Sequence, residues 1–122
     1  MPHCILEYTD NVLDQPNWRE LLLEIHEALV ASGLFQRADI KSRVVCHSLY
    51  VIGDGDPKRA FVTLNLQILS GRTDEQKTSL SQACLTILQR TFPKTLHQGK
   101  CSFTVQVSEL HRASYQRIRT ED

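Results

Sequence analysis

AFVTLNLQIL, residues 60–69, alternates apolar and polar side chains along most of its length. A period of two is typical of a β-strand whose two faces meet different surroundings. We therefore expect a strand with one face in a core and an uncharged polar face on the other side. The apolar set is Val62, Leu64, Leu66 and Ile68, and the polar set is Thr63, Asn65 and Gln67.

Three further segments have strand character. The run His3–Tyr8 is short and apolar, and residues 42–52 are rich in β-branched and aromatic side chains, which favours one strand or a bent pair. Residues 101–110 alternate like the first segment, with Thr104, Gln106 and Ser108 as the polar set. The glycine-rich segment 53–57 predicts a turn.

Two segments have a helical pattern. Residues 14–32 and residues 74–92 each carry an apolar stripe at helical spacing. Capping residues, glycine and proline stand where these helices would begin and end. They are Asp14 as N-cap and Gly33 as terminator of the first, and the capping-box pair Thr73 and Gln76 with the terminator Pro93 for the second.

The element order is therefore β-α-β followed by β-α-β. We expect one domain over residues 1–122, built from halves of about 1–58 and 59–116 with a short polar tail. A helix between two strands implies a parallel crossover, so both helices should cover one face of a four-stranded sheet. The class is α/β, or α+β in some schemes. The uncharged polar face should meet another subunit or a solvated channel.

Bulk composition limits the classes of function that we expect for this chain. The 122 residues contain 14 Lys+Arg and 14 Asp+Glu, so no charge excess indicates nucleic acid or an acidic membrane. No apolar run is long enough to span a bilayer, and the N-terminus lacks the pattern of a signal peptide. We expect a cytoplasmic protein without membrane association. The tail from His111 should be loosely ordered or contact another subunit.

Metal binding is not expected from the cysteine and histidine spacing. No C-x-x-C pair is present, and the five histidines are scattered. We expect the cysteines to be buried thiols, and we expect neither a metal nor a cofactor. The cysteines are Cys4, Cys46, Cys84 and Cys101.

Pro2 is the first residue with potential chemistry. Removal of Met1 before a small residue would leave proline as the N-terminus, with a free secondary amine. An ordinary α-amino group has a pKa of about 8. Desolvation and neighbouring cations both lower that value, and a neutral amine can take a proton from carbon beside a carbonyl. The competing interpretation is that Pro2 has no special role.

Cations are the second feature. Lys41 and Arg43 are two apart at the start of a predicted strand and so point to one side. Arg72 follows the strand at 60–69, in the loop before the second helix. Arginine binds carboxylates through paired hydrogen bonds and can stabilise charge on a substrate oxygen. Taken singly, each could equally be a solvated surface charge.

The order and spacing of several short pieces resemble 5-carboxymethyl-2-hydroxymuconate isomerase. That family belongs to the tautomerase superfamily, with 4-oxalocrotonate tautomerase and macrophage migration inhibitory factor. The pieces are Met1-Pro2-His3, Glu7, Asp10-Asn11, Gly33-Leu34-Phe35, Ser42-Arg43-Val44, Ala60-Phe61-Val62, Gly71-Arg72 and Glu109-Leu110-His111.

The resemblance implies a homotrimer that isomerises a muconate-like dicarboxylate enol without a cofactor. Pro2 would carry the proton, Arg72 would match the family's loop arginine, and Lys41 with Arg43 would cover its strand pair. The family pair is Arg-Ser-Arg, and Lys41 departs from it. Because lysine lacks the bidentate fork, the preferred substrate could differ. Ala60 stands where Pro2 stands in the first half, which implies one site per subunit.

Two alternatives remain at the level of sequence. The same element order occurs in ferredoxin-like domains, but an RNA-binding version needs stacked aromatic side chains that the central strands lack. A non-catalytic, small-molecule-binding tautomerase homologue is the stronger alternative. The state of Met1 matters to both, because with Met1 retained the Pro2 nitrogen is an amide and not a base.

Overall fold

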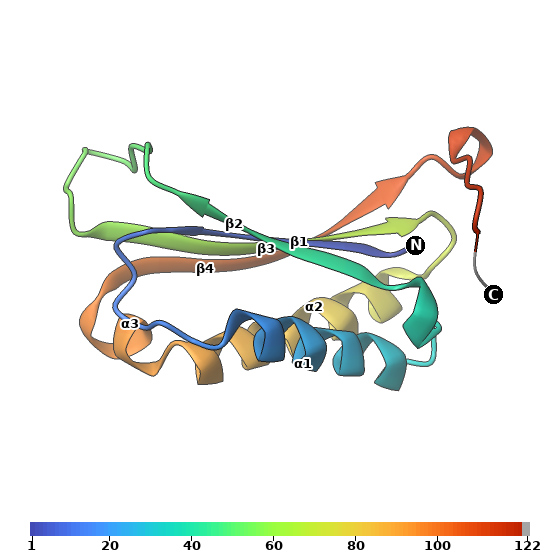
Figure 1. Cartoon of the computed structure of the whole chain (residues 1–122), viewed down its shortest axis with the longest axis horizontal. Helices are drawn as coiled ribbons and strands as arrows, with labels where there is room; N and C mark the ends of the chain where they lie inside the picture. The colour runs from blue at the N-terminus through green and yellow to red at the C-terminus, as the bar shows by residue number, and fades with distance from the viewer. Residues whose placement is uncertain (121–122) are drawn as a thin grey trace.

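Four strands form one mixed sheet in the order β2-β1-β3-β4, and both long helices cover one of its faces (Figure 1). The computed structural model describes residues 1–120. β1 pairs with β2 and β3 with β4 in parallel, while β1 and β3 are antiparallel. The expected duplicated β-α-β architecture is therefore confirmed. The elements are β1 (His3–Thr9), α1 (Trp18–Ala31), η1 (Arg37–Asp39), β2 (Lys41–His47), β3 (Arg59–Leu69), α2 (Asp74–Thr91), α3 (Pro93–Gln98), β4 (Lys100–Leu110) and η2 (Arg112–Ser114).

The core lies between the sheet and the two helices. Alternate side chains of β3, from Ala60 to Ile68, are almost completely buried, as the period of two predicts. Burying one such aliphatic side chain stabilises the fold by roughly 1.5–3 kcal/mol. The helices contribute the facing layer, which consists of Leu21, Ile25 and Leu29 from α1 and Leu80, Cys84, Ile87 and Leu88 from α2.

The helix boundaries follow the capping signals in part. The capping box is present at α2, where Thr73 Oγ1 accepts from Gln76 N at 3.1 Å and Gln76 Oε1 accepts from Thr73 N at 3.0 Å. Gly33 follows α1 with φ of +77°, a conformation that glycine adopts without strain. Pro93 ends α2 but also begins the short helix α3, which the sequence pattern did not predict.

Asp14 does not cap α1, and that prediction was wrong. The helix begins four residues later, at Trp18, because Asn17 Oδ1 accepts from Glu20 N at 3.1 Å. Asp14 Oδ1 instead accepts from the backbone N of Thr95 at 2.7 Å and from its hydroxyl at 2.6 Å. The Asp14 carboxylate thus links the segment before α1 to the first turn of α3.

The strand predicted over residues 42–52 is also shorter than expected. β2 ends at His47, where its partner strand β1 ends at Thr9. Beyond that point no strand of the described chain pairs with the segment, so Leu49 and Val51 are 96% and 83% exposed. The expectation of buried cysteines is confirmed for Cys4 and Cys84 but was wrong for Cys46, which is exposed, and Cys101 is only half-buried.

The second face of the sheet is open and polar along β3 and β4. Thr104 Oγ1 donates to Thr63 Oγ1 at 2.7 Å, and Ser108 Oγ donates to Asn65 Oδ1 at 2.6 Å. These contacts confirm the predicted uncharged polar row. Within residues 1–120, no helix is long and apolar enough to cross a membrane.

Candidate active site

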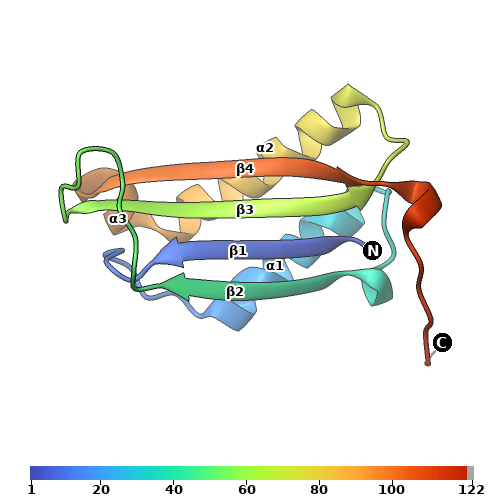
Figure 2. The same ribbon diagram turned by 90° about the horizontal axis from the view of Figure 1, so that it is seen from above.

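The N-terminus lies beside the start of β2, and its first residues are held by backbone contacts. The Pro2 side chain is buried, and its carbonyl accepts from Lys41 N at 3.1 Å. The amino group of Met1 donates to the carbonyl oxygen of Asp39 at 3.3 Å. The chain terminus therefore has a defined position at one end of β1 (Figure 2).

A cavity of about 520 Å³ opens beside Met1. This volume is within the usual range of small-molecule sites, roughly 300–1,000 Å³. Among residues 1–120, basic side chains dominate its polar lining, and Asp39 is the one acidic residue in it. The lining consists of Met1, Leu34, Phe35, Gln36, Asp39, Leu69, Arg72, Tyr115, Arg117 and Arg119.

Arg72 lines this cavity, and two backbone carbonyl oxygens hold its guanidinium in place. It donates to the carbonyl oxygens of Leu69 and Leu34, each at 3.2 Å, and lies 5.0 Å over the ring of Phe35. A guanidinium has five N–H donors, so these two bonds leave capacity for a bound carboxylate. The resulting position is fixed, as a residue that orients a ligand requires.

Lys41 and Arg43 are placed differently from each other. Lys41 Nζ donates to the carbonyl oxygen of Asp39 at 3.1 Å, the acceptor that Met1 also uses. Arg43 is exposed on the open face of the sheet and does not line the cavity. Of the three predicted cations, the structure thus brings Arg72 and Lys41 to the terminus and leaves Arg43 farther out.

The electrostatic environment of the terminus favours a neutral amine. Partial burial lowers the pKa of the Met1 amino group below 8.0, and the positive charge of Lys41 lowers it further. The neighbouring imidazole of His3 also has a lowered pKa, because it is partly buried and lies near the terminal amine and Arg43. An amino group at this position therefore loses its proton more readily than an ordinary surface amino group.

The C-terminal tail supplies residues that the sequence pattern missed. We expected this segment to be loosely ordered or to contact another subunit, but it folds against its own N-terminus. Tyr115 Oη lies 3.4 Å from His3 Nε2. Arg117 and Arg119 reach Asp39 Oδ1 at 3.3 and 2.7 Å. The sequence offered one signal for this arrangement. Tyr115, Arg117 and Arg119 follow one another at intervals of two residues, which places their side chains on one side of an extended chain.

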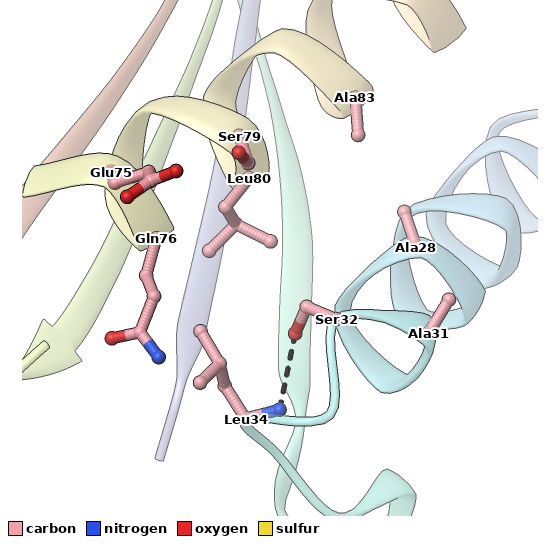
Figure 3. A pocket seen from close by; sticks show the side chains of 9 residues that line it. All are labelled: Ala28, Ala31, Ser32, Leu34, Glu75, Gln76, Ser79, Leu80 and Ala83. Carbon is pink, nitrogen blue, oxygen red and sulfur yellow. Dashed lines mark hydrogen bonds between the residues drawn. The ribbon is translucent and has the colours of Figure 1, made fainter. Parts of the chain in front are cut away.

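A second cavity of about 520 Å³ lies between the two long helices and shares Leu34 with the first (Figure 3). Its floor is apolar, with Leu34 and Leu80 pointing into the groove. None of the nine described residues that line it is a cation, and Glu75 is the acidic one among them. The two cavities have the same volume but different linings. Of the two, the first combines the Met1 amino group with arginines.

A metal centre has no support within residues 1–120. No group of three or more histidine, cysteine, aspartate or glutamate side chains there could hold an ion.

Comparison with known proteins identifies the family. A sequence model of 5-carboxymethyl-2-hydroxymuconate isomerase matches residues 2–120. The Escherichia coli 5-carboxymethyl-2-hydroxymuconate Delta-isomerase is 27% identical over 111 residues, covering 91% of this chain and 88% of that protein.

Solved structures agree with this assignment. A 5-carboxymethyl-2-hydroxymuconate isomerase from Deinococcus radiodurans R1 superposes with a TM-score of 0.89 at 33% identity, covering 98% of this chain and 90% of that one. A fused 4-OT, a symmetric trimer, shares the fold with a TM-score of 0.73 at 19% identity, covering 91% and 87%. The chain therefore belongs to the 5-carboxymethyl-2-hydroxymuconate isomerase family and is an isomerase of the tautomerase superfamily.

Proposed function

We propose that this chain moves a proton within a muconate-like enol or keto dicarboxylate, with the amine of Pro2 as the base once Met1 is removed. The observation that carries the proposal is the position of the terminus. It lies at a cavity with Arg72, and burial and Lys41 together lower the pKa of the Met1 amino group, which occupies the terminus here. Once Met1 is removed, the Pro2 amine would lie close to the same two influences. No cofactor is needed for such a transfer.

The proposed reaction has two proton steps. The neutral amine takes a proton from carbon beside a carbonyl, and the electron pair left behind delocalises onto the carbonyl oxygen. Where it takes the proton from an enol hydroxyl instead, the electron pair stays on that oxygen and is shared with the conjugated carbons, so both routes give an enolate. Arg72 and Lys41 stabilise that negative charge, as fixed donors do at sites of developing charge. The protonated amine then returns the proton to a different carbon, which regenerates the neutral amine.

The substrate class is taken from the relatives. Both the Escherichia coli and the Deinococcus radiodurans proteins are named for 5-carboxymethyl-2-hydroxymuconate. A cavity rich in arginine suits a compound with more than one carboxylate. We propose the same class here, and the lysine at position 41 is the feature expected to alter preference within it.

A homotrimer is part of the proposal. The open face carries an uncharged polar row, which suits contact between subunits or a solvated channel. The fused 4-OT with the same fold is a symmetric trimer.

Comparing two forms of the protein tests the mechanism. One form has Met1 removed and the other retains it, each verified by intact mass, and both are assayed with muconate-type and phenylpyruvate-type enols. We expect turnover only by the processed form, because the retained form has an amide at Pro2. Equal turnover by both would exclude the amine as the base. No turnover by either would favour a non-catalytic binding protein.

A further inference from the structure

Tyr115 is the one residue of the segment 111–120 that is not exposed. Figure 2 shows this segment running from the end of β4 past the N-terminus. Arg112 fixes its first turn by donating from Nε and Nη2 to the carbonyl oxygen of Ser70, at 3.1 and 2.6 Å. The backbone N of Tyr115 in turn donates to the carbonyl oxygen of Arg112 at 3.3 Å. The backbone that carries the tyrosine is therefore anchored.

The side chain of Tyr115 belongs to the cavity beside the chain terminus. It shares the lining of that cavity with Met1 and Arg72. Its hydroxyl oxygen lies 3.4 Å from Nε2 of His3, two residues from the terminus. Gln36 is the other uncharged side chain with an N–H or O–H donor among the described lining residues, and it is exposed. Tyr115 is thus the neutral donor of this cavity that a neighbouring side chain holds in position.

The protonation of His3 decides what the Tyr115 hydroxyl can do. Burial, followed by the positive charges of the terminal amine, Arg43 and Lys41, lowers the pKa of His3, so the ring is neutral at pH 7. A neutral imidazole carries one proton, on Nδ1 or on Nε2. Nδ1 is buried and has no hydrogen-bond partner among residues 1–120. A buried N–H without an acceptor is rare in folded proteins, so the proton belongs on Nε2.

With this tautomer, His3 is the donor and Tyr115 Oη the acceptor of a long hydrogen bond. The O–H of the tyrosine then stays available to donate to a ligand. A donor that is held in place beforehand needs no reorganisation when charge develops on a substrate oxygen. Lys41, in contrast, does not line the cavity, and its ammonium group donates to the carbonyl oxygen of Asp39. Tyr115 is therefore better placed than Lys41 for direct contact with such an oxygen.

We propose that the Tyr115 hydroxyl is a further catalytic group, which donates a hydrogen bond to the enolate oxygen, and that His3 is its positioning residue. This inference rests on the function proposed above. The terminal amine takes the proton from the substrate, and the electron pair moves onto the carbonyl oxygen. Tyr115 donates to that oxygen without giving up its own proton. Arg72 remains available for a carboxylate of the same substrate.

Removing the hydroxyl alone tests its contact with the substrate oxygen. In protein with Met1 removed, Tyr115→Phe should lower kcat for a muconate-type enol about 10- to 100-fold, because a hydrogen bond to developing charge is lost. KM should change much less, since that charge is absent from the bound substrate. Tyr50→Phe removes a hydroxyl that binds Asp10 outside the cavity and should leave both constants unchanged. An unchanged kcat in Tyr115→Phe, or a loss confined to KM, would overturn the proposal.

Substitutions of His3 test the positioning role. His3→Gln keeps a side-chain N–H donor, whereas His3→Leu keeps bulk without a donor. We expect His3→Leu to lower kcat about 3- to 10-fold and His3→Gln to retain more of it. In the Tyr115→Phe background, His3→Leu should cause no further loss, because His3 acts through the hydroxyl. Additive losses would show that His3 acts independently of Tyr115 and would overturn its positioning role.

Binding of an enolate mimic tests the contact without turnover. Titration calorimetry uses the Met1-retaining protein, which has no free proline amine, and two ligands. Ionised 4-hydroxy-3-nitrobenzoate offers a carboxylate and an enolate-like phenolate oxygen, and 3-nitrobenzoate lacks that oxygen. We expect Tyr115→Phe to weaken binding of the first about 10- to 100-fold and to leave the second unchanged. Undetectable binding of the first, or equal changes for both, would overturn the proposal. The expected difference in a protein without turnover would support Tyr115 and reject only the proposed reaction.

Discussion

Lys41 and Met1 donate to one acceptor, the carbonyl oxygen of Asp39, at 3.1 Å from Nζ and 3.3 Å from the terminal nitrogen. An ammonium group is thereby held next to the chain terminus, where two positive charges repel. After burial, the charge of Lys41 is the main cause of the lowered pKa of the terminal amine. The shared acceptor links a residue of β2 to the acid–base behaviour of the N-terminus.

The first prediction concerns pH. In processed protein, kcat/KM should rise with pH through an apparent pKa below the ordinary value of about 8, because the base acts in its neutral form. Lys41→Gln removes a cation that disfavours protonation, so this pKa should increase toward 8. The measurement is the pH profile of kcat/KM. Lys58→Gln, which removes an exposed charge outside the cavity, serves as the control. A profile that does not move in Lys41→Gln would contradict the electrostatic role.

The second prediction compares the two cations of the site. Arg72→Ala should reduce kcat/KM by about 10- to 100-fold, because a charge-assisted hydrogen bond contributes roughly 1.5–3 kcal/mol. Lys41→Ala should reduce kcat/KM by less. Arg72→Lys should recover part of the loss, since the charge returns without the bidentate geometry. Thermal unfolding must accompany the assay because Arg72 also binds the carbonyls of Leu34 and Leu69. Wild-type activity in a folded Arg72→Ala protein would remove Arg72 from the mechanism.

The sheet and the two long helices could be predicted because each signal was local. The period of two in β3 and the capping box before α2 depend on neighbours within a few residues. The start of α1 was mispredicted because two residues could serve as cap. Asn17 took that role, while Asp14 bound Thr95, which lies 81 positions along the chain. No local pattern contains such a contact.

The residues of the candidate site also fall into those with a local sequence signal and those without one. Pro2, Lys41 and Arg72 could be predicted as candidates from their chemistry and from their places at strand ends, and they remain predictions. Arg117 and Arg119 were missed, because their position depends on the tail running past the N-terminus (Figure 2) to reach Asp39, 78 and 80 positions earlier in the chain. Polar tails commonly remain unattached, so composition favoured loose order, and that alternative was wrong. Contact of the tail with another subunit stays a prediction. Asp39 and these two arginines come together only in the folded chain.

The third prediction tests the contact that replaced the expected cap. Asp14→Ala should lower the free energy of unfolding by about 1–3 kcal/mol at pH 7, since Thr95 N and its hydroxyl lose their acceptor. Burial alone would raise the pKa of Asp14, but the hydrogen bonds from Thr95 and Lys94 outweigh it, and the pKa is lowered from 3.8.

The sign of the pH dependence follows. A carboxylate with a lowered pKa in the folded state stabilises the protein above its unfolded value, and that stabilisation is lost as the pH falls through the folded value. The difference between wild type and Asp14→Ala should therefore shrink below about pH 4. Urea unfolding at several pH values measures it. Asp74→Ala, at an exposed carboxylate, should cost less than about 1 kcal/mol. A pH-independent difference would contradict the role of the charge.

The last prediction concerns the open face of the sheet and the proposed trimer. Light scattering of the unmodified chain at micromolar concentration should give three times the chain mass of 14.0 kDa. Thr63→Glu with Thr104→Glu places two carboxylates at the hydrogen-bonded pair on this face. Threefold symmetry would bring six such charges together, so repulsion and desolvation should dissociate the assembly. Thr78→Glu with Thr86→Glu adds the same charge on the exposed side of α2 and should leave the mass unchanged. An unmodified protein that is a monomer, or a double variant that stays trimeric, would show that this face does not lie between subunits.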